Sequence, residues 1–126
     1  MKFEHFALNV PDVRAMSLWY VDHLGMKIVR SKEEAPYTKF LADETGRVIF
    51  EIYTNSSVPM PDYAVVPPLN FHIGFAADDA QATQSRLESA GASLFKEDTL
   101  DDGSRLLMMR DPWGVPIQLC QRATPF

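Results

Sequence analysis

The spacing of apolar residues divides the first half of the chain into four strands and one helix. Residues 3–10 alternate between apolar and polar side chains, which predicts a strand that ends before Pro11. Apolar residues then recur every three or four positions over residues 13–24, which predicts a helix. Asp12 suits the N-cap of this helix and Gly25 its end. Three further strands are predicted at residues 26–30, 37–42 and 47–53.

The second half of the chain repeats this order after an interruption. Residues 54–69 contain four prolines, which predicts a linker or surface loop. The helix of the second half is capped at Asp78 or Asp79 and ends near Ala90, before Gly91. Its four strands are predicted at residues 69–76, 94–97, 105–110 and 116–121. The pattern is therefore strand, helix and three strands, repeated once.

The repeat can be aligned on two short motifs. "HFALNVPD" begins at His5, and "HIGFAADD" begins 67 residues later at His72. The same interval separates Glu51 in "FEIY" from Gln118 in "IQLC". The two copies therefore carry a His–Glu pair and a His–Gln pair at equal spacing. Internal repeats of this kind indicate that one supersecondary unit has been used twice.

These elements predict an α+β fold made of two tandem βαβββ modules. Module one spans about residues 1–55, a linker spans about 56–68, and module two spans about 69–126. With 126 residues in total, the chain has the size of a single domain, 1–126.

Alternation along the strands separates the side chains into two faces. In the strands that carry the paired residues, one face is bulky and apolar and suits packing under a helix. The other face is small or polar and carries the candidate ligands, His5, Glu51, His72 and Gln118. Candidate substrate-pocket residues are Asn9, Tyr53 and Cys120 on that face, and Trp113 in the turn before the last strand.

Two imidazoles, a carboxylate and an amide oxygen form a reasonable ligand set for a divalent transition metal. Nickel, zinc, cobalt, manganese and iron all tolerate such a set. Gln118 either binds the metal through its amide oxygen or orients a water beside it. Glu51 either is only a ligand or also serves as a general base. A lone strand histidine is more often a hydrogen-bonded structural residue, but two histidines at equivalent points of a repeat favour metal binding.

Composition narrows the choice of partners and compartment. Hydrophobic residues make up 46% and charged residues 23% of the chain, which is typical of a globular domain. The net charge of −5 argues against nucleic acids and anionic membranes as partners. The single cysteine gives no disulfide framework, and no apolar run is long enough for a membrane span. The N-terminus lacks the apolar core of a signal peptide, so we expect a cytoplasmic protein.

Five stretches of the chain together resemble the vicinal oxygen chelate superfamily. They are "EHFALNV", "WYVDHLGM", "FEIY", "FHIGF" and "DPWGVPIQL". The superfamily includes glyoxalase I, bleomycin-resistance proteins and extradiol dioxygenases. The resemblance implies that the paired modules form an open, partly closed, barrel-like sheet of eight strands with helices outside. It also implies a metal held by His5, Glu51, His72 and Gln118, and a homodimer.

The best match is to glyoxalase I of the bacterial type, and Gln118 is where the sequence departs from it. The resembling enzymes have a second glutamate there, which is thought to move protons between substrate carbons. An amide cannot act as a carboxylate base, so Gln118 argues against authentic lactoylglutathione lyase activity.

The main hypothesis is a glyoxalase-like divalent-metal enzyme that acts on a small oxygenated molecule by lyase, isomerase or epimerase chemistry. One alternative is a metal-free protein of the bleomycin-resistance type that sequesters a drug or metabolite. Another is a ferrous-iron dioxygenase.

Overall fold

The computed structural model describes residues 1–126, and the chain divides into two compact units, Met1–Pro61 and Asp62–Phe126. Unit 1 contains β1 (Phe6–Asn9), α1 (Val13–Leu24), β2 (Lys27–Ser31), β3 (Lys39–Ala42) and β4 (Val48–Tyr53). Unit 2 contains η1 (Tyr63–Val65), β5 (Ile73–Ala76), α2 (Ala80–Ser89), β6 (Ser93–Thr99), β7 (Arg105–Arg110) and β8 (Pro116–Gln121).

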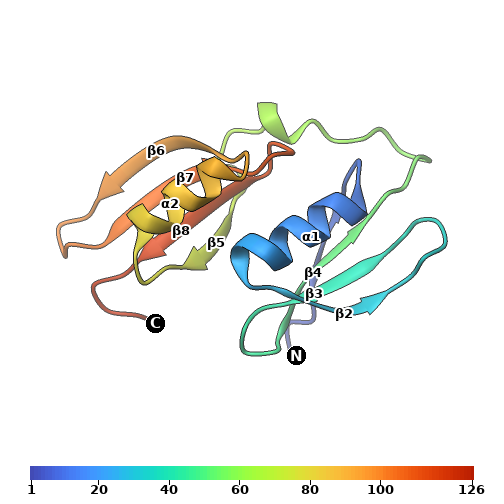
Figure 1. Cartoon of the computed structure of the whole chain (residues 1–126), viewed down its shortest axis with the longest axis horizontal. Coiled ribbons are helices and arrows are strands. Elements are labelled where there is room, and N and C mark those ends of the chain that lie inside the picture. Colours follow the sequence, from blue (N-terminus) through green and yellow to red (C-terminus); the bar gives the residue numbers. More distant parts are fainter. The chain divides into compact units, whose positions relative to one another are not determined.

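Each unit has one α-helix and one four-stranded sheet (Figure 1). The strand orders are β1-β4-β3-β2 and β5-β8-β7-β6, so the two sheets have the same topology. The predicted α+β fold of two βαβββ modules is confirmed, but the eight strands form two separate four-stranded sheets and not the one barrel-like sheet of eight strands that was expected.

The two predicted helix caps are present. The Asp12 carboxylate accepts a hydrogen bond from the Ala15 amide at 2.9 Å, and Asp79 accepts one from Ala82 at the same distance. Gly25 ends α1 with a φ of 67°, in the left-handed region that a residue with a side chain rarely adopts. Neither helix is long and apolar enough to cross a membrane.

The core of unit 1 lies between α1 and one face of its sheet. Met16 and Tyr20 of α1 are almost fully buried, as are Leu41, Phe50 and Ile52 of the sheet. The rings of Tyr20 and Phe50 meet edge to face with centroids 5.4 Å apart. Burial of each such side chain contributes about 1.5–3 kcal/mol, so this face is committed to packing. The opposite face of the sheet is left for other roles.

The core of unit 2 is built the same way. Ala80 and Leu87 of α2 are fully buried, together with Leu107 of β7 and Ile117 and Leu119 of β8. Since Gln118 alternates with two of these residues along β8, it belongs to the opposite face of the sheet.

The register of the strands reproduces the sequence repeat. In unit 1, β1 runs parallel to β4 with Ala7 beside Glu51; in unit 2, β5 runs parallel to β8 with Gly74 beside Gln118. The register of β2 against β3 shifts around Val29, and that of β6 against β7 shifts around Phe95. Both edge strands therefore carry an irregularity at corresponding positions.

The linker differs most from the sequence prediction. Residues 63–65 form the short helix η1, and the strand predicted at 69–76 begins only at Ile73. A turn in which the Asn70 amide donates to the Pro67 carbonyl oxygen, at 2.9 Å, precedes β5. Proline cannot donate to a sheet, so strand pairing starts after this turn.

Candidate functional site

The first predicted pair meets in unit 1. His5 lies directly before β1, and Glu51 lies on the parallel neighbour β4. The Nε2 atom of His5 is 3.0 Å from the Oε2 atom of Glu51, and both side chains are about three-quarters buried. The His5 ring also stands edge-on to the ring of Phe40, with centroids 5.5 Å apart. These contacts hold the imidazole in one orientation.

His5 has a carboxylate at each ring nitrogen. Its Nδ1 atom contacts the carboxylate of Glu4, while its Nε2 atom faces Glu51. A neutral imidazole has one donor and one acceptor, and an ionised carboxylate can only accept. The Nε2 atom can therefore either donate its own proton to Glu51 or, in the tautomer with the proton on Nδ1 toward Glu4, offer its lone pair to a metal ion.

The side chains of His5 and Glu51 end close together, with Nε2 3.0 Å from Oε2, so the two atoms could hydrogen-bond to each other or bind one ion together. Metal-bound histidines also commonly donate their second ring N–H to a carboxylate, which is the position that Glu4 takes.

The second predicted pair lies in unit 2. His72 directly precedes β5, and its Nδ1 atom is 2.8 Å from the carbonyl oxygen of Pro68. Because a carbonyl can only accept, the proton is on Nδ1 and the lone pair is on Nε2. This is the tautomer that binds a metal through Nε2.

Gln118 is half-buried on β8, and its amide oxygen already has a partner. The Cys120 thiol lies 3.4 Å from the Oε1 atom of Gln118 and donates to it. Burial raises the pKa of this thiol, and the Arg122 guanidinium lowers it by a smaller amount. The thiol therefore stays protonated at neutral pH and remains a donor. Oε1 can still offer its second lone pair to a metal or a water.

The structure thus brings one of the expected pairs together, His5 with Glu51; in unit 2, His72 lies directly before β5, and it is Gly74 that lies beside Gln118. The structure brings no three His, Cys, Asp or Glu side chains together in an arrangement that could hold a metal ion.

The predicted pocket residues have different surroundings. Asn9 is buried, and its side-chain amide donates to the Asn55 carbonyl oxygen at 3.0 Å and accepts from the Asn55 amide at 2.8 Å. These two bonds tie the end of β1 to the residues after β4. Tyr53, beside Asn9 in the register, is half-buried, as is Trp113 in its turn.

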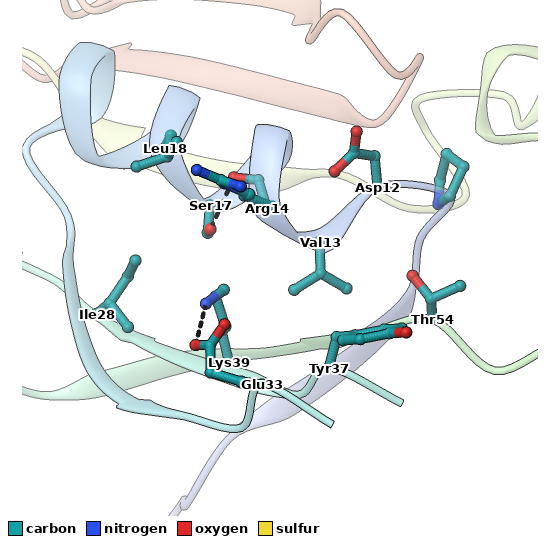
Figure 2. A pocket seen from close by; sticks show the side chains of 11 residues that line it. Asp12, Val13, Arg14, Ser17, Leu18, Ile28, Glu33, Tyr37, Lys39 and Thr54 are labelled. Atoms are coloured by element: carbon teal, nitrogen blue, oxygen red, sulfur yellow. Dashed lines mark hydrogen bonds and ion pairs between the residues drawn. The ribbon is translucent and has the colours of Figure 1, made fainter. Parts of the chain in front are cut away.

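The structure also contains a cavity that the sequence did not reveal. It has a volume of about 720 Å³ and lies in unit 1 between α1 and the β2–β3 hairpin (Figure 2). None of the predicted site residues lines it. The one feature of the sequence that points to this cavity is Lys39, a charged residue two positions before the buried Leu41 on the same face of β3.

The chain was compared with known proteins. It matches the sequence profile described as the Glyoxalase/Bleomycin resistance protein/Dioxygenase superfamily over residues 2–119. A lactoylglutathione lyase from Salmonella typhimurium is 27% identical over 128 residues, which cover 96% of this chain and 93% of the relative.

Two solved structures illustrate the likeness in fold. A glyoxalase I mutant from Zea mays superposes with a TM-score of 0.75 at 22% identity, over 98% of this chain and 45% of that chain. TnmS3, an antibiotic binding protein from Streptomyces sp. CB03234, superposes with a TM-score of 0.68 at 19% identity, over 98% of this chain and 97% of that chain.

Proposed function

Since the chain belongs to the Glyoxalase/Bleomycin resistance protein/Dioxygenase superfamily, we propose that it is a glyoxalase-like enzyme that depends on a divalent metal. Its substrate is a small oxygenated molecule, and its chemistry is of the lyase, isomerase or epimerase type. The observation that carries the proposal is the placement of His5 between two carboxylates, with Nε2 3.0 Å from Glu51.

The proposed ligands are His5, Glu51, His72 and Gln118. Two imidazole nitrogens and two oxygens suit nickel, zinc, cobalt, manganese or iron. Glu51 lies between the small Ala7 and the large Phe40 in the register, and Gln118 lies between the small Gly74 and the large Met108, so each oxygen ligand has room on one side only. When bound, the ion would act as a Lewis acid that stabilises negative charge on a substrate oxygen.

Proton transfer in this proposal falls to Glu51. It is the one carboxylate among the four residues, and a carboxylate can accept a proton from a carbon next to a polarised carbonyl. Gln118 has no such capacity, because its amide does not titrate. The reaction then uses one base, which takes a proton from one substrate carbon and delivers it to a neighbouring atom.

Gln118 also separates this chain from the function named for its relatives. The Salmonella relative is named lactoylglutathione lyase, at 27% identity. The enzymes that the chain resembles move their proton with a glutamate at the position of Gln118. We therefore propose a different small oxygenated substrate for this protein.

The test is elemental analysis of protein purified without chelator and without nickel affinity resin. We expect about one divalent ion per chain, lost in Glu51→Ala. Glu44→Ala, in the exposed turn between β3 and β4, is the matched control and should keep the ion. If the protein takes up none of the five metals on incubation, the proposed enzyme mechanism is wrong.

One observation favours a second candidate, a metal-free protein that sequesters a small molecule. The Cys120 thiol already satisfies one lone pair of Gln118 Oε1, so this residue is stable without a metal. TnmS3, which shares the fold, is described as an antibiotic binding protein. Under this candidate, a His5→Ala, His72→Ala double variant would bind its ligand as tightly as the wild type.

A further inference from the structure

We propose that the cavity between α1 and the β2–β3 hairpin is a second binding site, for a small organic carboxylate with an apolar or aromatic body. Its volume of about 720 Å³ lies within the range of small-molecule pockets. This proposal is independent of the metal site, because different residues form the two sites.

The cavity and the metal ligands belong to opposite faces of the unit 1 sheet. Glu51 alternates along β4 with Phe50 and Ile52, which are buried on the side of α1. Val13 and Ser17 of α1 line the cavity, so the cavity lies on the helix side.

Lys39 is the central polar residue of the cavity. It shares a face of β3 with the fully buried Leu41, and only 12% of its side chain is exposed. Its ammonium group donates to Ser31 Oγ at 2.7 Å and lies 3.5 Å from Glu33 Oε1. Since a buried charge is costly without good partners, a lysine at this position indicates a role beyond packing. An ammonium group has three donors, so it can also serve a ligand in the cavity.

Glu33 indicates which chemical group of a ligand Lys39 would bind. Its carboxylate accepts from Ser31 Oγ at 2.7 Å and faces Lys39, yet 87% of the Glu33 side chain is exposed. The Ser31 hydroxyl and then Lys39 hold the pKa of Glu33 below its usual range, and Arg14 adds a small effect in the same direction. Because the Glu33 carboxylate is exposed, it can move away from the buried ammonium group of Lys39, and a ligand carboxylate can take its place.

Arg14 provides a second cation from the helix wall. Figure 2 shows Arg14 on α1 above the cavity and Lys39 with Glu33 below it. A guanidinium group offers five N–H donors in a planar fork that matches a carboxylate. A ligand carboxylate between Arg14 and Lys39 would therefore have donors on two sides.

The remaining walls suit an apolar or aromatic body. Leu18 and Ile28 line the cavity and are 47% and 37% exposed. Tyr37 also lines it and is 50% exposed, and its φ of 60° is unusual for a residue with a side chain. A ring or aliphatic chain against these three side chains would remove apolar surface from water.

The test uses indole-3-acetate as the probe and indole-3-acetamide as its uncharged match, with binding measured by calorimetry. We expect the carboxylate to bind at least about tenfold more tightly than the amide, as a charge-assisted hydrogen bond requires. Lys39→Met and Arg14→Gln should each weaken binding by about tenfold or more. Glu33→Gln should strengthen it, because the competing carboxylate is gone.

Lys96→Met is the matched control, since Lys96 pairs with Asp98 at an exposed position in unit 2. It should leave binding unchanged. Lys39→Met should also keep the divalent metal, which separates this site from the proposed enzyme site. The proposal is overturned if the probe does not bind at millimolar concentration, if the amide binds equally well, or if Lys39→Met binds like the wild type.

Discussion

At the scale of single residues, His5 is the most informative position. Carboxylates face both of its ring nitrogens, and Nε2 lies 3.0 Å from Glu51. In the tautomer in which Glu4 accepts the Nδ1 proton, the lone pair is on Nε2, the atom that our proposal assigns to the metal.

Glu4→Gln should weaken divalent-metal binding by about tenfold, because partners that orient a ligand histidine typically change metal affinity by 10–100-fold. The measurement is competition against a coloured chelator. Glu34→Gln, at an exposed position between β2 and β3, should have no effect. Equal affinities of the Glu4 variant and the wild type would mean that Glu4 does not orient His5.

Cys120 gives a prediction about pH. Burial raises its pKa, so folding favours the neutral thiol. This contribution to stability is complete below the ordinary pKa of a cysteine and is lost as the pH rises through the raised value. A thiol reagent should therefore react with the folded protein only at a higher pH than with the same protein unfolded in urea. Coincident pH profiles would contradict the buried, hydrogen-bonded thiol.

At the scale of elements, the linker is bound to unit 2 by Arg110. Its guanidinium group donates to the carbonyl oxygens of Tyr63, Val66 and Gly114, each at 2.9 Å. These hydrogen bonds satisfy backbone carbonyl groups that are not paired within a sheet or an α-helix. They explain why η1 belongs with the second sheet although the sequence here predicts only a loop.

Gly114→Ala should lower the free energy of unfolding by about 2–4 kcal/mol in urea titrations. Gly114 has a φ of 83°, and an added Cβ atom would lie only 2.7–2.9 Å from Ala64. Gly46→Ala separates backbone strain from the steric clash, because Gly46 has a φ of 82° with nothing within 4 Å of an added Cβ atom. This variant should lose only about 1 kcal/mol of unfolding free energy. Equal losses of unfolding free energy in the two variants would show that η1 does not pack closely on the turn at Gly114.

At the scale of the whole molecule, the repeat distributes the proposed ligands over both units. Each unit carries a histidine directly before its first strand and an oxygen ligand on its last strand. Neither pair by itself has enough ligands for a typical transition-metal site. The proposal therefore takes ligands from both repeats, and the contribution of each repeat can be tested separately.

His5→Ala and His72→Ala should each remove most of the bound metal in elemental analysis. His23→Ala is the control, because this third histidine lies in the last turn of α1 near Trp19. It should keep the metal. If only one of the two ligand variants lost its metal, the site would be confined to the repeat of that histidine. The other pair would then not belong to the ligand set.

Much of the fold could be predicted because it is encoded locally. The caps Asp12 and Asp79 and the stop at Gly25 act within a few residues of their own position. The repeat could be recognised in the sequence because the strands of both copies alternate between residues that pack under the helix and residues that do not. The helix η1 was not predicted: Asp62 caps it locally, but the carbonyl oxygens of Tyr63 and Val66 accept hydrogen bonds from Arg110, more than forty residues further along the chain.

The sequence by itself determined the two βαβββ units, the offset between their repeats and the four candidate ligands, because hydrophobic spacing and turn residues act over short distances. Only the tertiary structure decided how these side chains are used. It placed Glu4 and Glu51 on opposite sides of the His5 ring and tied Asn9 to Asn55. It also buried Lys39 beneath α1 and so created the cavity. Most of these contacts join residues on separate strands, helices or loops, and their geometry is set by packing rather than by any local pattern.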